Sequence, residues 1–179
     1  MQYTEELIDI LNYAEEEAMR TGSFEITADH ILLGIIRHRD NCACRAFSKF
    51  GVAPQELKEH IDNLLFRHES ISYNRRGELK SSRDAQNAIN MSALEANLSG
   101  DIVIGTGHLF LALCKCPACK GINYLKEHGM DISGLRMSME EEKTGGSPAV
   151  NVPEAAAESE AAGAEPIVTY FSSEGKLQS

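Results

Sequence analysis

The segment TADHILLGIIRH, residues 27–38, decides how this chain is organised, because a close copy, GTGHLFLALCKC, follows at residues 105–116. Both segments carry apolar residues at helical spacing after a short polar start, which predicts a buried helix in each place. A constant offset of 78 residues relates the two copies and their flanks without a gap, and it pairs His30 with His108. A gap-free register over half the chain indicates an internal duplication.

The flanks of the two segments predict the same order of elements in each copy. A capped helix comes first, then a loop, the helix with the histidine, a short helix that ends at glycine, and a closing helix. The predicted starts are Thr4, Thr27, Pro54, Ser82 and Thr106, which are hydroxyl caps or an N-terminal proline. The sequence therefore predicts an all-α fold made of two sets of about four helices.

The composition divides the chain into three parts. Repeat one is assigned to residues 1–66 and repeat two to residues 80–142, with a polar connector at 67–79. Residues 143–179 are rich in Gly, Ala, Pro, Ser and Glu, and we expect them to be disordered because they bury too little apolar surface. The apolar patch in IVTYFSSEGKLQS, residues 167–179, is interpreted as a frayed end, with a docking motif as the alternative.

Charge and composition exclude several classes of partner. The 179 residues carry a net charge of −10 and no tryptophan, so neither nucleic acid nor an anionic membrane is an expected partner. No apolar run is long enough to span a bilayer, and the start of the chain does not resemble a signal peptide. We expect a cytoplasmic location, in which five cysteines are reduced thiols or metal ligands.

The residues YTEELIDILNYAEEEAMRTGSFEITADHILLGIIRH, followed by RAFSKFGV, resemble the N-terminal domain of Clp ATPases, especially the ClpC and ClpA type. Both copies fit the family's pattern, and the resemblance covers residues 1 to about 140. It implies an all-α bundle of two pseudo-twofold-related repeats that receives substrates or adaptor proteins for the ATPase ring. No G-x-x-x-x-G-K-[ST] phosphate loop occurs in this sequence, so we expect no ATP hydrolysis and no enzyme activity.

The resemblance also implies a candidate ligand site in the first copy. In the ClpC branch an acid before this histidine pairs with the guanidinium of a phosphorylated arginine, and the matching residue here is Asp29. Thr4 would help to hold the phosphate at the start of the first helix. The alternative is that Asp29 only caps or favours the start of its own helix. Because Gly107 replaces the acid in the second copy, we expect any such ligand to bind the first copy alone.

The cysteines are the clearest departure from the family pattern. Cys42 and Cys44 follow the first histidine helix, and Cys116 and Cys119 follow the second. Four thiolates could surround Zn²⁺ if the two loops meet, and Lys115 and Lys120 would lower the pKa of the second pair of thiols. The alternative is reduced cysteines that pack as small hydrophobic residues.

Two other features have plain interpretations. We interpret His30 and His108 as core histidines bonded to neighbouring backbone groups, with a metal or proton site as the alternative. The glutamate runs at residues 15–17 and 140–142 are interpreted as solvated faces.

The sequence thus favours a non-catalytic protein-binding module with no required cofactor, whose partners are substrates, adaptor proteins or a Clp ATPase. The alternative is a zinc- or thiol-based sensor that uses the cysteine loops on the same scaffold.

Overall fold

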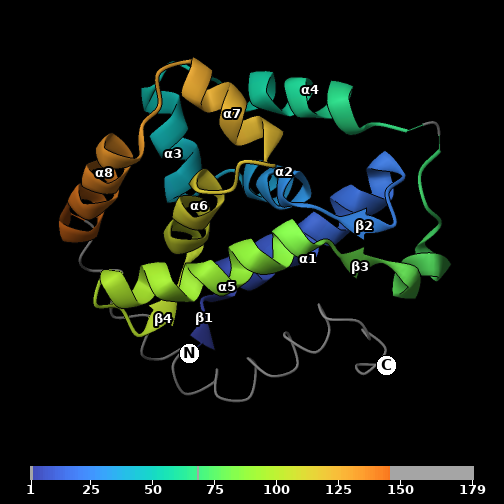
Figure 1. Ribbon diagram of the computed structural model, residues 1–179, viewed down its shortest axis with the longest axis horizontal. Helices are drawn as coiled ribbons and strands as arrows, with labels where there is room; N and C mark the ends of the chain where they lie inside the picture. The colour runs from blue at the N-terminus through green and yellow to red at the C-terminus, as the bar shows by residue number, and fades with distance from the viewer. Residues whose placement is uncertain (1, 68, 146–179) are drawn as a thin grey trace.

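The computed structural model describes residues 2–67 and 69–145, with side chains up to residue 140, and the chain is predominantly helical (Figure 1). Repeat one contains β1 (Gln2–Tyr3), α1 (Glu5–Thr21), β2 (Glu25–Ile26), α2 (Ala28–His38), α3 (Cys42–Lys49) and α4 (Pro54–Leu65). The 3-10 helix η1 (Tyr73–Glu78) lies in the connector. Repeat two contains β3 (Lys80–Ser81), α5 (Arg83–Leu98), β4 (Val103–Ile104), α6 (Thr106–Cys114), α7 (Lys120–Glu127) and α8 (Ile132–Gly145). The expected all-α fold is confirmed.

Short side chains fix where the first helix of each repeat begins. The Thr4 hydroxyl accepts a hydrogen bond from the Leu7 backbone N–H at 3.1 Å, and the Ser82 hydroxyl accepts one from Ala85 at the same distance. These bonds satisfy N–H groups that have no partner within the helix. Both hydroxyl caps predicted for these starts are therefore present.

The short strands of one repeat pair with the short strands of the other. β1 pairs in parallel with β4, and β2 pairs in parallel with β3, so each pair joins a strand of one repeat to a strand of the other. At the offset of 78 residues, β1 corresponds to β3 and β2 to β4. This reciprocal pairing is what a pseudo-twofold relation between the repeats requires.

The core lies between the two histidine helices and their neighbours. Every residue from Ala28 to Ile36 in α2 is buried, and α6 is buried along most of its length. The rings of Phe47 in α3 and Phe110 in α6 meet edge to face at 5.9 Å, which links the repeats in one core. Figure 1 shows α4 and α7 along one side of this core and α1 and α5 along the other.

The ends of the described chain bear on two sequence predictions. α8 continues to Gly145, three residues beyond the boundary at 142 that composition indicates. The predicted disorder of the remaining tail, residues 146–179, lies outside the described residues. No helix in the described part of the chain is long and apolar enough to cross a membrane.

Candidate functional site

Asp29 lies at the junction of the repeats and holds the start of α7. Only 3% of the residue is exposed, and its carboxylate accepts hydrogen bonds from the backbone N–H of Lys120 at 2.9 Å and of Gly121 at 2.8 Å. The Cys119 thiol donates a third bond at 3.3 Å. A carboxylate placed on the N–H groups of a helix start also matches the positive end of the helix dipole. Asp29 is thus a helix cap that acts from one repeat on the other.

The corresponding helix of repeat one is capped differently, which explains the glycine in the second copy. Asn41 directly precedes α3, and its side chain caps this helix by accepting a hydrogen bond from the Cys44 backbone N–H at 2.9 Å. Its counterpart Cys119 makes no such bond to α7, so that helix depends on Asp29. Gly107, the counterpart of Asp29, faces Cys42, whose sulfur would lie 3.3 Å from a Cβ placed there. Each helix start therefore receives one side-chain cap.

The contacts of Thr4 and Asp29 bear directly on the phosphoarginine hypothesis. Thr4 caps α1, and both carboxylate oxygens of Asp29 accept bonds from the α7 start. A guanidinium would have to displace those buried donors, which costs about 1–3 kcal/mol for each donor left without a partner. The assignment of Thr4 and Asp29 to a ligand stays a prediction.

His30 is a buried neutral histidine. Its Nδ1 accepts a hydrogen bond from the Thr27 backbone N–H at 3.0 Å, and its Nε2 lies 2.9 Å from the Thr21 hydroxyl. Burial is the main reason that its pKa falls to about 4, and the positive charges of Arg20 and Arg67 add to the effect. The interpretation of this residue as a core histidine bonded to backbone is confirmed.

His108 repeats the backbone bond but has a different second partner. Its Nδ1 accepts from the Gly105 N–H at 2.9 Å, while its Nε2 lies 2.8 Å from a carboxylate oxygen of Asp101. The ring is more exposed than that of His30 and lines the hollow described below. The bond to backbone is again as expected, and the carboxylate partner is a feature that the duplication does not predict.

The cysteines form no group that fits a metal ion in the part of the chain that the structure describes. Among the described residues, which include all five cysteines, no three His, Cys, Asp or Glu side chains are placed to hold a metal ion. Cys44 donates to the Ile35 carbonyl, and Cys119 donates to Asp29. The assignment of Cys42, Cys44, Cys116 and Cys119 to a shared zinc site therefore stays a prediction, with no matching cluster in the described residues.

The environment of the buried thiols opposes thiolate chemistry. Burial raises the pKa of Cys44 to about 11 and that of Cys114 to about 12. Burial, with the nearby Asp29 carboxylate, raises the pKa of Cys119 well above its usual range. The expectation that Lys115 and Lys120 activate Cys119 is wrong, because desolvation and the negative charge of Asp29 raise the pKa of this thiol.

The glutamate run in α1 is not a solvated face, contrary to the sequence interpretation. Glu15 and Glu17 are buried, and Glu15 lies 2.5 Å from Arg76 of η1. Glu17 binds Arg20 at 2.7 Å and Arg37 at 3.3 Å. These partners replace the water that the carboxylates lose on burial. In the second run only the side chain of Glu140 is described, and it is exposed.

A buried glutamate at the equivalent place holds repeat two together. Glu95 is 1% exposed and binds Lys115 of α6 at 2.6 Å and Arg136 of α8 at 2.9 Å. Burial alone would raise its pKa, but these two cations lower it. Lys115 and Arg136 correspond to Arg37 and Lys58. The Glu17–Arg37 and Glu95–Lys115 pairs lie at the constant offset, and this repeated pair of opposite charges is a signal for the buried glutamates in the sequence.

Repeat two has a hollow where repeat one has an ion cluster. In repeat one, Arg20 of α1 reaches Asp62 of α4 at 2.7 Å, and Lys58 binds the same carboxylate at 2.9 Å. The counterparts of Arg20 and Asp62 are Leu98 and Glu140. Leucine is shorter and carries no charge, so it neither fills the space nor forms this ion pair. A cavity of about 140 Å³ remains between α5, α6 and α8.

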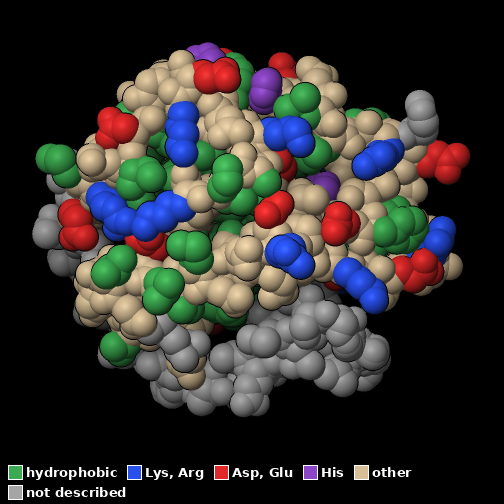
Figure 2. Space-filling view, in the orientation of Figure 1, with side chains coloured by type: hydrophobic (Ala, Val, Ile, Leu, Met, Phe, Trp, Pro, Cys, Tyr) green, Lys and Arg blue, Asp and Glu red, His purple; other side chains and the backbone are tan. Residues whose placement is uncertain are grey.

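We call this hollow the repeat-two groove. It is lined by Leu98, Gly107, Leu111, Arg136, Met139 and Glu140 among others. Leu94 and Leu98 lie one turn apart on α5 and are 56% and 72% exposed, and Ile102 follows at 82%. Figure 2 shows hydrophobic side chains on this part of the surface, over α5 and towards α8. Exposed apolar residues gathered on one face mark interaction surfaces.

Comparison with known proteins assigns most of the chain to a family of repeat domains. A family model described as the Clp repeat (R) N-terminal domain matches residues 2–128. The Bacillus subtilis protein named as the negative regulator of genetic competence ClpC/MecB is 26% identical over 138 residues, which are 77% of this chain and 16% of the relative. The chaperone protein ClpB of Oceanobacillus iheyensis is 29% identical over 142 residues, 77% of this chain and 17% of the relative. The chain thus spans about a sixth of the length of these relatives.

Solved structures show the same fold. The N-terminal domain of the chaperone ClpD from Arabidopsis thaliana aligns with a TM-score of 0.63 and 16% identity, and the alignment covers 80% of this chain and 95% of that one. The Hsp104 N-terminal domain from Candida albicans aligns with a TM-score of 0.61 and 17% identity, over 77% and 89% of the two chains.

Proposed function

Since this chain belongs to the family of Clp repeat N-terminal domains, we propose that it is a non-catalytic module that binds substrates or adaptor proteins for a Clp ATPase. The observation that carries the proposal is the difference between the repeats. Glu16 and Arg20 of repeat one are paired with other charged groups, whereas their counterparts Leu94 and Leu98 are exposed to solvent. An exposed apolar face on a rigid helical scaffold suits apolar segments of other proteins.

The expected partner surface is therefore on repeat two. A partner segment that covers Leu94, Leu98 and Ile102 removes apolar area from water, at roughly 25 cal/mol for each Å². The cytoplasm stays the expected compartment, and the sequence contains no phosphate loop that would make the chain itself an ATPase.

The test is binding of an unfolded protein to the full chain. Fluorescently labelled, reduced casein serves as the probe, and fluorescence anisotropy gives the Kd for the wild type and for the double variant Leu94→Glu/Leu98→Arg. This variant gives repeat two the residues of repeat one. We expect saturable binding to the wild type and a Kd at least about tenfold higher in the variant, which corresponds to about 1.4 kcal/mol.

A matched control removes an exposed apolar residue from repeat one. Phe24 is 39% exposed and corresponds to Ile102, so Phe24→Ser should leave the Kd unchanged. Thermal unfolding verifies that each variant is folded. Casein that does not bind, or that binds the double variant as well as the wild type, would contradict the proposal.

Phosphoarginine recognition is the finer form of this proposal. It is supported by the family resemblance and by Thr4 at the start of α1, and it is opposed by the bonds that Asp29 makes to α7. Calorimetric titration of free phosphoarginine into wild type and Asp29→Ala decides it. Saturable binding that the variant loses would assign the ligand to the first repeat, and absence of binding would remove this ligand from the proposal.

The sensor alternative depends on zinc or on reactive thiols. Metal analysis of the protein as purified, with thiol titration under native conditions, tests it directly. Stoichiometric zinc would favour the sensor. Metal-free protein with slow-reacting thiols would contradict the sensor and leave the binding module as the proposed function.

A further inference from the structure

The repeat-two groove has the size of a site for one aromatic ring, and its lining combines apolar residues with the polar side chains of Ser99, His108, Arg136 and Glu140. Its cavity measures about 140 Å³, and an apolar cavity of roughly 150 Å³ accepts a benzene molecule. Leu98, Leu111 and Met139 provide apolar walls, and Gly107 leaves the space that a side chain would take. Arg136 is held at the edge by its ion pair with Glu95 at 2.9 Å.

The chain that leaves this groove carries a matching segment. α8 lines the groove and ends at Gly145, and the sequence continues with 21 residues, 146–166, that contain four glutamates and no aromatic residue. Ile167–Phe171, with sequence IVTYF, then brings two branched aliphatic and two aromatic side chains together. No other stretch after residue 145 has comparable apolar character.

The length of the intervening sequence allows the segment to return. The composition of residues 146–166 predicts a flexible linker, for which a root-mean-square end-to-end distance of about 25 Å is expected, whereas a domain of this size has a radius of gyration of about 15 Å. Since the connection begins at the helix that lines the groove, its span is sufficient. A connection of this kind gives an effective concentration in the millimolar range, so a contact with a dissociation constant below that range is largely formed.

We propose that the segment Ile167–Phe171 of the same chain occupies the repeat-two groove and places one aromatic ring against Leu98, Leu111 and Met139. This contact does not depend on the proposed function, because it can be measured with no partner present.

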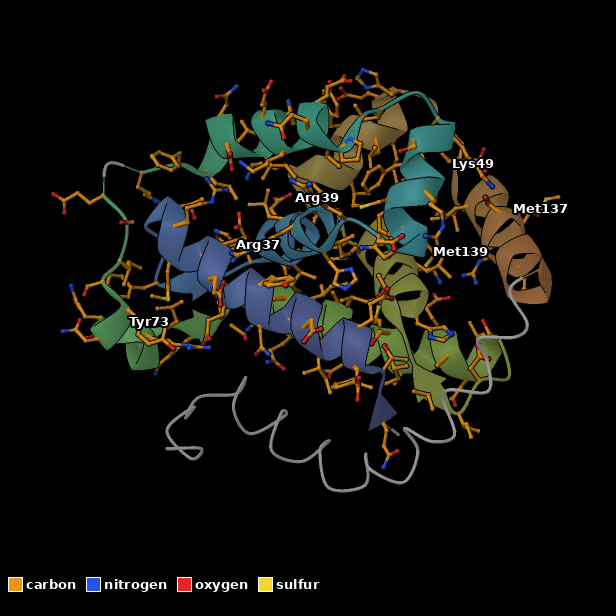
Figure 3. All side chains as sticks on the ribbon, turned by 180° about the vertical axis from the view of Figure 1, so that it is seen from behind. Arg37, Arg39, Lys49, Tyr73, Met137 and Met139 are labelled. Atoms are coloured by element: carbon orange, nitrogen blue, oxygen red, sulfur yellow. The ribbon has the colours of Figure 1, made fainter. Side chains whose placement is uncertain are left out.

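The two methionines of α8 provide a reporter and a control. Met139 lines the groove, whereas Met137 is 65% exposed and points away from the body of the molecule in Figure 3. In the full chain labelled with ¹³C at the methionine methyl groups, a ring stacked on Met139 should shift its methyl signal upfield. The variant Tyr170→Ser/Phe171→Ser changes no residue of the described helices and should abolish that shift, while the Met137 signal stays in place.

A second variant approaches the contact from the groove. Leu98→Arg introduces the residue that repeat one carries, which fills the groove and faces Glu140. It should also abolish the Met139 shift, whereas Phe24→Ser should preserve it. A peptide with the sequence EPIVTYFS, added to the Tyr170→Ser/Phe171→Ser chain, should restore the shift as its concentration rises.

Two results would overturn the proposal. One is a Met139 signal that is identical in the wild type and in the Tyr170→Ser/Phe171→Ser variant. The other is a shift that grows with protein concentration while the mass measured by light scattering doubles, since this would place the segment in the groove of a second copy.

Discussion

Asp29 and Asn41 show that the two repeats differ in the residue that caps the short helix after each histidine helix. Asn41 caps its own helix α3, and Asp29 caps α7 of the other repeat, where Cys119 offers no cap. Because Asn41 already supplies an acceptor at the start of α3, no acid is required at Gly107 to cap that helix. The acid in the first copy and the glycine in the second thus reflect different ways of capping α7 and α3, rather than a ligand site and its lost copy.

The first prediction concerns the side chain that caps the start of α7. Asp29→Ala leaves buried donors of α7 without an acceptor and should lower the free energy of unfolding by about 1–3 kcal/mol, as measured by urea denaturation. Adding Cys119→Asn gives α7 the cap that α3 has and should recover part of the loss. If Asp29→Ala is as stable as the wild type, the capping role is wrong.

His30 gives the second prediction, which concerns pH. Its pKa of about 4 in the fold lies below the ordinary value of 6.5, so the unfolded chain binds the proton more readily. The stability from the neutral ring is complete above pH 6.5 and is lost as the pH falls to 4. The full loss is on the order of 3 kcal/mol.

Thermal unfolding between pH 7 and pH 4 checks this dependence. The variant His30→Asn should flatten the pH dependence above pH 5, where carboxyl groups contribute least, although it is itself less stable. An unchanged pH profile in the variant would show that another group is responsible.

At the scale of elements, the close contact of α1 and α2 depends on Gly34. A Cβ at this residue would lie 2.6 Å from the carbonyl oxygen of Ile10, which belongs to the backbone of α1 and cannot rotate away. The corresponding residue of repeat two is Ala112, so α5 and α6 accommodate a methyl group there.

The third prediction compares these two helix pairs. Gly34→Ala should lower the free energy of unfolding by about 1–3 kcal/mol through overpacking, despite the better helix propensity of alanine. The matched change Ala112→Gly should cost only about 1 kcal/mol from helix propensity. Chemical denaturation measures both, and a stabilising Gly34→Ala would contradict the close packing.

At the scale of the whole molecule, the repeats depend on each other. The strands pair across the repeats, Asp29 caps a helix of repeat two, and Phe47 packs on Phe110. A single repeat would lose these contacts and expose part of the shared core to water.

The fourth prediction follows from this dependence. Residues 1–79 expressed alone should melt without a cooperative transition in circular dichroism, whereas the full chain should unfold in one cooperative step. Independent cooperative melting of the isolated half would show that the duplication preserved two self-sufficient units.

The sequence predicts the parts of this structure that depend on local or repeated signals. The hydroxyl caps at Thr4 and Ser82 and the duplication itself are of this kind. The role of Asp29 depends on a helix start 91 residues later, and the burial of Glu15 depends on Arg76 in the connector. The groove arises from side chains that are short or missing, and only the packed helices show such a space. The placement of the two cysteine loops relative to one another likewise depends on how the repeats are oriented.

We infer that the two repeats share a scaffold and that the α5 face of repeat two, with Leu94 and Leu98 exposed, is the binding surface. The most direct test is to map amide chemical-shift changes in the full, isotope-labelled chain while unlabelled reduced casein is added. The account predicts changes along α5, α6 and α8, around Leu94, Leu98 and Met139, with little change along α1 and α4. Changes that gather instead around Thr4 and Asp29, or none at saturating casein, would contradict it.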